Sequence, residues 1–169
     1  MEKQFKVYSL VFCRRISKEG PELLLGLKRR GFGTGKMNGY GGKKEHNETI
    51  RECAKRELFE ESGLVVAIDD LEHVASLEFN MDSLLMLVEV FFTSRFEGEA
   101  ITSDEMIPSW TLEKELPVLF QEGKTWADDE LWLPQVLSGL GGRICGRFTY
   151  NPDNSTISSY SIFPHQELL

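Results

Sequence analysis

Three glutamates lie close together in the segment RELFEESGL: Glu57, Glu60 and Glu61. At about 100° per residue on a helix, Glu57 and Glu61 lie in the apolar stripe that carries Leu58, and Glu60 lies beside that stripe. A carboxylate that is buried without a partner costs on the order of several kcal/mol, or it takes up a proton. The segment therefore needs an explanation for acidic side chains that face the core.

Three explanations account for these glutamates. A solvent-exposed acidic face is the ordinary meaning of a run of charges. Ion pairs with Arg51 or Arg56 are the second explanation. The third is a site for divalent cations, because oxygen ligands suit Mg²⁺ or Mn²⁺ and the chain lacks a His/Cys pattern typical of zinc. Mg²⁺ prefers one or two carboxylates plus substrate phosphates, so this third explanation predicts a phosphate compound as the substrate.

The sequence signals both ends of the helix that carries the glutamates. Thr49 and Glu52 fit a capping box, in which each side chain accepts a hydrogen bond from the backbone amide of the other residue. Gly63 suits the left-handed conformation that ends many helices. We therefore expect a helix at about 49–61, and its ends set the direction in which the carboxylates point.

Length, composition and charge restrict the class of protein. The 169 residues predict a single domain over 1–169. No apolar run approaches the roughly 20 residues that span a bilayer, and the start shows no signal-peptide pattern. The net charge of −8 opposes binding to nucleic acid or to an anionic membrane. The three cysteines, Cys13, Cys53 and Cys145, are interpreted as reduced thiols of a cytoplasmic protein.

Strand and helix patterns alternate along the chain. Strands are expected where β-branched and aromatic residues gather: 5–12, 23–29, 73–79, 84–94 and 106–112, with a turn at 17–22 and a final hairpin at 146–162. A second helix is expected within 127–142. The segment 30–42 has six glycines in thirteen residues, so it is a loop whose backbone can approach a ligand closely. This order predicts an α/β domain, in which helices cover a mixed sheet.

The stretch GKKEHNETIRECAKRELFEESGL, at 42–64, resembles the Nudix box, G-x5-E-x7-R-E-U-x-E-E-x-G-U, where U is a bulky aliphatic residue. Every fixed position of that pattern is present: Gly42, Glu48, Arg56, Glu57, Leu58, Glu60, Glu61, Gly63 and Leu64. The resemblance implies the Nudix fold, a mixed β-sheet sandwiched between α-helices. It also implies Mg²⁺-dependent cleavage of a nucleoside diphosphate that is linked to another group.

The resemblance to Nudix enzymes also implies roles for individual residues. Mg²⁺, or alternatively Mn²⁺, would be held by four groups: the carboxylates of Glu57, Glu60 and Glu61 and the backbone carbonyl of Gly41. Arg56 would hold the glutamates in position by ion pairing, and Glu48 would face Arg56 or support the metal site from outside. Glu105, in the segment SDEM at 103–106, would be a further metal ligand or the base that activates water.

Segments outside the box are similar to one branch of the Nudix family, the animal enzymes that hydrolyse oxidised purine nucleoside triphosphates. These segments are LKRRGFGTGKMNGYGGK at 27–43, SDEM at 103–106 and WADDELWLPQVL at 126–137. The likeness implies a base pocket formed by eight residues: Ser9, Lys28, Phe32, Asn38, Met86, Trp126, Asp128 and Asp129. The substrate would be 8-oxo-dGTP, 2-hydroxy-dATP or O6-methyl-dGTP, cleaved to the monophosphate and pyrophosphate.

Two adjacent aspartates, Asp128 and Asp129, suit recognition of a purine edge. In an apolar setting both cannot ionise cheaply, so the pKa of one should rise. The protonated acid can donate to a purine carbonyl, while the ionised neighbour accepts from ring N–H or amino groups. Exchange of the proton would let the pair recognise oxidised guanine and adenine. The bland alternatives are that Asp128 only caps a helix, that Asn38 only forms a turn, and that Trp132 is a core residue.

Four positions depart from the animal enzymes. Met37 replaces a tryptophan, Leu77 an aromatic pocket residue, Leu87 an aspartate, and Ala127 a proline. Leu77 bears most directly on the choice of base, because the loss of a ring weakens stacking. The sequence therefore leaves the ranking of modified purines open.

Two other functions remain as alternatives. One is a Nudix pyrophosphohydrolase with another substrate, such as ADP-ribose or a nucleotide sugar. The other is a catalytically silent Nudix module that binds nucleotides, although such a module would be expected to lose box glutamates. We expect a monomer whose partner is the small nucleotide substrate, in the cytoplasm with a mitochondrial or nuclear fraction.

Overall fold

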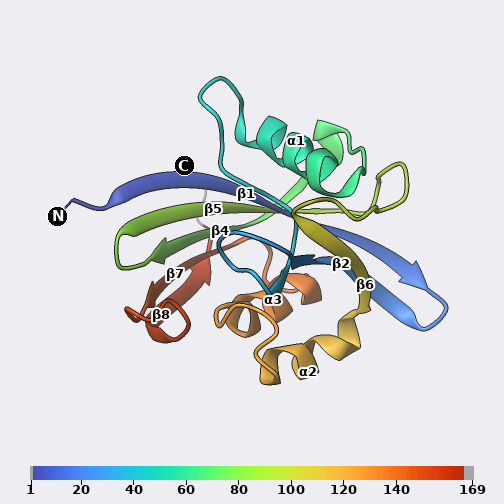
Figure 1. The fold of residues 1–169 in the computed structure, drawn as a ribbon. Coiled ribbons are helices and arrows are strands. Elements are labelled where there is room, and N and C mark those ends of the chain that lie inside the picture. The colour runs from blue at the N-terminus through green and yellow to red at the C-terminus, as the bar shows by residue number, and fades with distance from the viewer. Residues whose placement is uncertain (1, 166–169) are drawn as a thin grey trace.

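A mixed β-sheet forms the centre of the computed structural model, which describes residues 2–165 (Figure 1). Its strands, in chain order, are β1 (Gln4–Ser17), β2 (Gly20–Lys28), β3 (Met37–Asn38), β4 (Glu72–Asn80), β5 (Leu84–Thr93), β6 (Met106–Leu112), β7 (Ile144–Tyr150) and β8 (Ile157–Pro164). They are ordered β3-β2-β1-β5-β4-β7-β8, and β6 pairs with β2. The pairs β1–β5 and β4–β7 are parallel and the others are antiparallel, so the predicted mixed sheet is confirmed.

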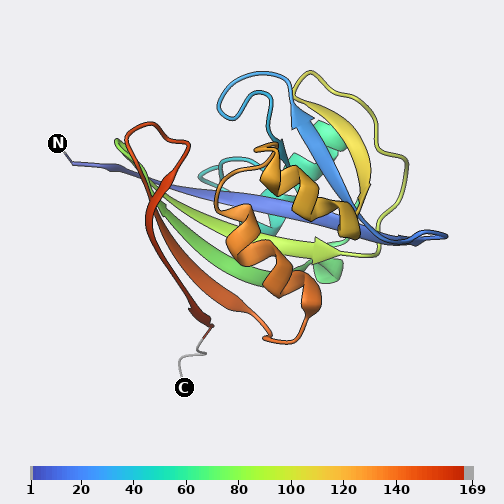
Figure 2. The same ribbon diagram turned by 90° about the horizontal axis from the view of Figure 1, so that it is seen from below.

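Helices cover both faces of this sheet. The helix α1 (Ile50–Ser62) lies on one face, and α2 (Leu116–Gln121) and α3 (Asp129–Ser138) lie on the other, where Figure 2 shows them in orange. Single 3₁₀ turns lie at Ile68–Asp70 and Glu113–Glu115. The sequence patterns missed α2, because a helix of six residues is too short for a 3.6-residue period to stand out.

Alternation along β1 divides the core between the two layers. Val11 packs in the cluster beneath α1, together with Leu58. Its neighbour Phe12 points to the opposite face and packs in the cluster of α3, together with Trp132 and Leu133. Successive side chains on a strand point to opposite faces, so one strand supplies both cores and holds the two helical layers at a fixed separation.

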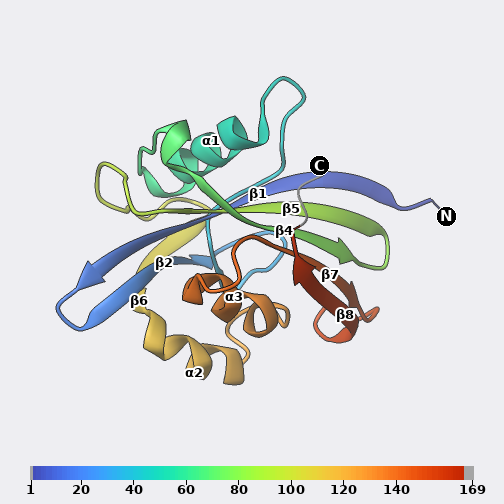
Figure 3. The ribbon, with the colours of Figure 1, turned by 180° about the vertical axis from the view of Figure 1, so that it is seen from behind.

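The first two strands form a hairpin that opens along its length. Residues 14–17 of β1 pair with residues 20–23 of β2, and the earlier part of β1 pairs with β5 instead. Figure 3 shows the tip of this hairpin projecting beyond the rest of the sheet. On the edge of β1 that β2 leaves free, the glycine-rich segment forms single bridges, Val11 with Tyr40 and Tyr8 with Lys43. The opening thus brings that segment against β1, between the two helical layers.

Several predicted boundaries need correction. The first turn is shorter than 17–22, because the strands continue to Ser17 and restart at Gly20. The second helix spans Asp129–Ser138 rather than most of 127–142, and Gly139 in the left-handed conformation ends it. Within residues 2–165, no helix has the length and hydropathy needed to cross a membrane.

Candidate active site

The helix α1 begins and ends at the predicted residues. Thr49 Oγ1 accepts a hydrogen bond from the amide of Glu52 at 3.1 Å, and Glu52 Oε2 accepts one from the amide of Thr49 at 3.4 Å. Gly63 has φ 77°, and its amide donates to the carbonyl of Phe59. The predicted capping box and glycine end are therefore confirmed, and they orient the glutamates of this helix.

Glu61 is the glutamate of the box that faces inward. It is only 7% exposed and lines the large cavity described below. Burial is the main reason that the pKa of Glu61 is raised to about 7; the charge of Lys28 lowers it, and those of Glu57, Glu105 and Glu60 add to the rise. A solvent-exposed acidic face is therefore wrong for Glu61. That explanation holds for Glu60, whose side chain is 53% exposed.

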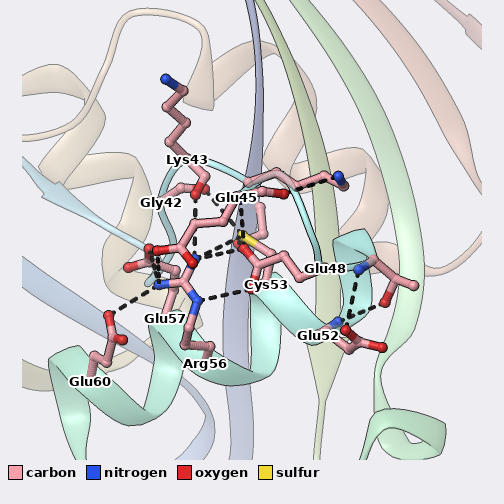
Figure 4. Close-up of polar contacts among 12 residues, drawn as sticks. Gly42, Lys43, Glu45, Glu48, Glu52, Cys53, Arg56, Glu57 and Glu60 are labelled. Atoms are coloured by element: carbon pink, nitrogen blue, oxygen red, sulfur yellow. Dashed lines mark hydrogen bonds and ion pairs between the residues drawn. The ribbon is translucent and has the colours of Figure 1, made fainter.

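Arg56 is the centre of an ion-pair network on α1 (Figure 4). Its Nε and Nη2 atoms donate to the two carboxylate oxygens of Glu48 at 2.9 and 2.7 Å. Its Nη1 atom donates to Glu57 Oε1 at 2.9 Å and to Glu60 Oε2 at 3.2 Å. Hydrogen bonds from Arg56 lower the pKa of Glu48 to about 2. The ion-pair explanation is thus correct for Arg56, which holds three carboxylates together.

Arg51, the other candidate for such ion pairs, is used differently. Its Nη1 atom donates to the backbone carbonyls of Leu71 and Ile68. Its guanidinium lies over the ring of Phe91, 5.1 Å from the ring centre. Arg51 therefore ties α1 to the following segment and leaves the glutamates to Arg56.

Two glycines let the loop before α1 pass close to the carboxylates. A Cβ atom on Gly41 would lie 1.8 Å from the carbonyl oxygen of Ser9. A Cβ atom on Gly42 would lie 2.4 Å from Glu57 Cδ. Neither position has room for a side chain, because the loop is packed between β1 and α1. The backbone of Gly41, the predicted metal ligand, therefore lies at the cavity wall beside the glutamates.

Glu105 lies at the end of the loop before β6 and is held by two cations. Lys28 Nζ and Arg30 Nε each donate to its carboxylate at 2.9 Å. These hydrogen bonds lower the pKa of Glu105, so the side chain is ionised. Lys28 lies at the cavity wall. It pairs with Glu105, and its charge also lowers the pKa of Glu61.

The carboxylates supply oxygen ligands that fit a hard divalent cation. Burial and the neighbouring acidic groups raise the pKa of Glu61, and a bound cation would lower it again. Within residues 2–165, however, no three His, Cys, Asp or Glu side chains are grouped closely enough to hold an ion. The reason is that Glu57 and Glu60 point to Arg56, so a cation would have to draw them away from it.

A cavity of about 490 Å³ lies between the sheet, α3 and the glycine-rich loop. All eight predicted substrate-binding residues line it: Ser9, Lys28, Phe32, Asn38, Met86, Trp126, Asp128 and Asp129. Glu61 and Gly41 line it too. The remaining predicted site residues lie outside its lining: Arg56, Glu57, Glu60 and Glu105. The structure therefore brings a base-sized cavity and one box glutamate together, and the other acidic groups lie outside the lining.

Asp128 and Asp129 are the most deeply buried acidic residues of this cavity, each 4% exposed. Asp128 Oδ2 accepts from Trp132 Nε1 at 2.7 Å, and Asp128 Oδ1 accepts from the hydroxyl of Tyr150. Asp129 Oδ2 accepts from the amide of Trp126 at 3.0 Å. The capping alternative is wrong, because the Asp128 side chain accepts no hydrogen bond from a backbone amide at the start of α3. Trp132 is a core residue as expected, and it also binds Asp128.

The pKa of each aspartate rises, for reasons that differ in part. Burial raises the pKa of Asp128, while hydrogen bonds from Tyr150 and Trp132 lower it. Burial and the charge of Asp128 raise the pKa of Asp129 well above its ordinary value. The pKa of Asp129 is therefore raised more than that of Asp128, because Asp128 has more hydrogen-bond donors around it.

Aromatic rings form the wall of the cavity on the loop side. Phe32 stacks on Trp126 with ring centres 5.0 Å apart and an interplanar angle of 29°. Gly33, with φ 84°, lies so close to Trp126 that a Cβ atom would be 3.0 Å from its ring. Phe32 is 59% exposed, so this pair forms an apolar edge where a planar base can enter.

Polar groups near this wall have partners within the protein. Asn38 Oδ1 accepts from the amide of Gly39 at 2.8 Å, and Asn38 lies in the strand β3, so the alternative that it only forms a turn is wrong. The amide NH₂ of Asn38 is then the end that a ligand can use. Ser9 lines the cavity, but its Oγ lies 3.3 Å from Cys53 Sγ in α1.

The departures from the animal enzymes have different positions. Leu77 is fully buried and lines the cavity, so it can affect the choice of base. Leu87 lies outside the lining, because its neighbour Met86 takes the cavity face of β5. Met37 and Ala127 pack against the core cluster of α3.

Two residues that sequence reasoning did not single out matter here. Tyr150 lines the cavity and binds Asp128. An aromatic residue with a polar tip at an inward-facing strand position was the available signal. Tyr40 is fully buried beside Glu61, and its hydroxyl has no hydrogen-bond partner among the described residues. Burial, followed by the charges of Glu61 and Cys13, raises the pKa of Tyr40.

Comparison with known proteins identifies the family. The sequence matches the NUDIX domain over residues 9–135, which is more than half of the chain. The chain therefore belongs to the Nudix family. The oxidized purine nucleoside triphosphate hydrolase of Mus musculus is 39% identical over 159 residues, which cover 93% of this chain and 94% of the mouse protein. The protein of the same name from Danio rerio is 45% identical over 117 residues, which cover 68% and 71% of the two chains.

Solved structures share the fold at lower identity. The mMutator MutT protein from Bacillus halodurans has a TM-score of 0.75 and 23% identity, covering 95% of this chain and 99% of its own. The NUDIX domain of Shewanella oneidensis NrtR, complexed with ADP ribose, has a TM-score of 0.64 and 14% identity, covering 82% and 89%. The predicted family, α/β Nudix fold and enzyme class, a hydrolase, are confirmed. Nudix enzymes act on small nucleotide substrates and use divalent cations.

Proposed function

We propose that this chain hydrolyses oxidised or otherwise modified purine nucleoside triphosphates to the monophosphate and pyrophosphate, and so removes them from the nucleotide pool. The substrates are 8-oxo-dGTP, 2-hydroxy-dATP and O6-methyl-dGTP. The observation that carries the proposal is the buried pair Asp128 and Asp129, in a cavity that also contains Glu61. The names of the mouse and zebrafish relatives support it.

The protein's own groups have separate tasks in this reaction. Asp128 and Asp129 accept from and donate to the base edge, and Trp126 and Phe32 stack against its plane. Asn38 adds an amide donor at the base. Because the cavity is closed by apolar side chains on the side of β4 and β5, the purine enters with its hydrogen-bonding edge toward α3 and its phosphates toward α1.

The α1 side holds the triphosphate and the cation. Mg²⁺, with Mn²⁺ as the alternative, would be held by Glu57, Glu60, Glu61 and the carbonyl of Gly41, and Glu105 would be a further ligand or the base for water. When bound, the cation neutralises charge on the phosphate oxygens. Glu105 is ionised beside Lys28 and Arg30, so it suits the role of ligand better than that of base. Lys28 also faces the phosphates, and Arg56 positions the carboxylates.

A substrate panel tests the proposed function. The purified chain is incubated with Mg²⁺ and each of the three modified triphosphates, with dGTP, ADP-ribose and a nucleotide sugar as comparisons. We expect release of pyrophosphate from the modified purines, with a higher kcat/KM than for dGTP. Cleavage of ADP-ribose or the nucleotide sugar with intact modified purines would favour the rival Nudix substrate. Binding without any turnover would favour a silent module.

We further propose that residues 1–169 form one Nudix domain that acts as a cytoplasmic monomer, with a mitochondrial or nuclear fraction. The charge of −8 argues against nucleic acid or an anionic membrane as a partner. Light scattering coupled to gel filtration gives the oligomeric state, and fractionation of cells gives the compartment. A stable dimer or a membrane-bound pool would contradict the respective part of this proposal.

A further inference from the structure

Tyr150, the last residue of β7, lines the base cavity. It is 6% exposed and lies edge-on to Trp126, with ring centres 6.2 Å apart. Its hydroxyl makes two hydrogen bonds to one residue, as donor to Asp128 Oδ1 and as acceptor from the amide of Asp128 at 3.2 Å. No motif of the sequence and no role in hydrolysis accounts for this clamp.

The direction of the hydroxyl proton follows from the partners of the clamp. A backbone N–H can only donate, so the amide of Asp128 takes up an acceptor site of the Tyr150 oxygen. The hydroxyl proton is then directed at the carboxylate. On the other oxygen of Asp128, Trp132 Nε1 also can only donate. Asp128 therefore receives two donors, and a proton of its own would compete with one of them.

Asp129 has a different set of contacts. Its Oδ2 accepts from the amide of Trp126, and its Oδ1 is the oxygen that can carry a proton toward the cavity. Lys36, in the loop before β3, is a cation from another element whose charge lowers the pKa of Asp129, whereas the neighbouring Asp128 carboxylate raises it. Lys36 lines the cavity, and its Nζ atom donates to the carbonyl of Gly123 at 3.0 Å.

We propose that Tyr150 is a specificity-determining positioning residue, which keeps Asp128 ionised and leaves the proton of the aspartate pair on Asp129. The inference rests on the proposed function and deepens it. It replaces free exchange of the proton between the two aspartates by one preferred arrangement, with an acceptor at Asp128 and a donor at Asp129.

One fixed arrangement selects one kind of base edge. Guanine and its 8-oxo form present a carbonyl at position 6 beside an N–H at position 1 and an amino group at position 2. The Asp129 hydroxyl fits the carbonyl, and the Asp128 carboxylate fits the two N–H groups. Oxidised adenine has an amino group at position 6, so it needs an acceptor where this arrangement has a donor. Tyr150 thus favours 8-oxo-dGTP over 2-hydroxy-dATP.

The test compares Tyr150→Phe, which removes one oxygen atom, with wild type. For both proteins kcat/KM is measured with 8-oxo-dGTP and with 2-hydroxy-dATP. We expect wild type to prefer 8-oxo-dGTP, and the variant to lose about tenfold of that preference, the factor typical of one hydrogen bond to a charged group. Tyr160→Phe is the matched control, because Tyr160 is exposed on β8 and stacks on Phe148. We expect it to keep the wild-type ratio.

The outcomes separate the inference from the proposed function. A ratio that stays within twofold in Tyr150→Phe, or a wild type that prefers 2-hydroxy-dATP, would overturn the role of Tyr150 while the hydrolase activity stands. If wild type cleaves neither substrate, the proposed function fails and this selectivity fails with it. If Tyr150→Phe loses both activities because it unfolds, a thermal melt shows the unfolding. A second measurement, made on wild type, then tests the inference.

That second measurement needs no substrate. Carboxyl ¹³C NMR of labelled aspartates, assigned with Asp129→Asn, reports which side chain of wild type carries the proton near neutral pH. We expect Asp128 to be ionised and Asp129 to be protonated. A protonated Asp128 beside an ionised Asp129 would overturn the inference, whatever the enzyme cleaves.

Discussion

Two groups of acidic residues lie at opposite ends of the site, one at α1 and the loop before it and one at the start of α3, and they are neutralised differently. Glu48, in the loop before α1, and Glu57 and Glu60, on α1, pair with Arg56, and Glu60 is also exposed to water. At the start of α3, Asp128 and Asp129 have hydrogen-bond donors around them, and burial raises the pKa of both, most of all that of Asp129. The α1 carboxylates can exchange one cation for another, whereas the aspartates present a fixed pattern. A mobile charge suits a metal and phosphate site, and a fixed pattern suits recognition of a base.

The largest effect is expected at the cation end. Glu61→Gln keeps the shape of the side chain and removes its charge, so turnover should fall by about a thousandfold, the factor for several kcal/mol of lost electrostatic stabilisation. In wild type, Mg²⁺ at ten times its Kd should add about 1.4 kcal/mol to the free energy of unfolding. Glu61→Gln should lose most of this gain, measured by thermal melts with and without Mg²⁺.

Glu72→Gln is the matched control for this change, because Glu72 is an exposed glutamate on β4. It should keep both turnover and the stabilisation by Mg²⁺. Full activity in Glu61→Gln would show that the cation site does not depend on this carboxylate.

At the base end, the two aspartates should respond unequally to the same substitution. Asp128→Asn turns an amide toward two donors and removes the negative charge, so kcat/KM for 8-oxo-dGTP should fall by about a hundredfold. Asp129→Asn replaces a neutral acid by a neutral donor, so the loss should stay below about tenfold. Equal losses in the two variants would show that the proton is not fixed on Asp129.

The same pair predicts a pH dependence of stability. A pKa of Asp129 that is raised in the folded state means that the folded protein binds a proton which the unfolded chain has lost above the ordinary Asp range. The free energy of unfolding should therefore fall as pH rises above about 4, and Asp129→Asn should reduce this slope, while the raised pKa values of Glu61 and Asp128 maintain the rest of it. Urea unfolding at pH 5 and pH 8 measures it, with Asp82→Asn, at an exposed position, as control.

A smaller effect is expected from the apolar wall at the base end. Leu77→Phe adds a ring to a buried position of the cavity lining, where stacking with a base is worth about 1 kcal/mol. The KM for 8-oxo-dGTP should fall by about fivefold, with little change in kcat. Leu87→Phe, on the other face of β5, should leave KM unchanged, and an equal shift there would mean that the effect is not local to the cavity.

The smallest change tests the core beneath the cation end. Tyr40→Phe removes a buried hydroxyl that has no partner among residues 2–165, so the free energy of unfolding should rise by about 1 kcal/mol. Turnover should change by less than twofold. Destabilisation in urea unfolding would show that the hydroxyl has a partner, and Tyr160→Phe gives the baseline for an exposed tyrosine.

The cation end could be predicted largely from sequence, because its residues lie within one helix and the loop before it. The capping box, Gly63 and the spacing of Glu57 and Glu61 are local features, and local geometry decides their directions. What local geometry could not show is that Arg56 collects three carboxylates, because rotamers depend on neighbours such as Glu48.

The base end was harder to predict, because it is assembled from distant segments. Tyr150 binds Asp128 across 22 positions of the chain, and that contact depends on the register of β7 beside β4. No local pattern contains this register. The alternation of β5, by contrast, is sufficient to place Leu87 on the face opposite Met86.

The strand β1 fixes the positions of both the base site and the phosphate site. Along one edge its register with β5 sets the base wall at Met86, and along the other the amide of Ser9 holds the carbonyl of Gly42 at 3.0 Å. The base site and the phosphate site are therefore both positioned by the same fourteen-residue strand. A slip by one residue would move one site by about 3.3 Å against the other and turn every side chain to the wrong face. The distance between the site for the purine and the site for its phosphates is thus set by hydrogen bonds of the backbone.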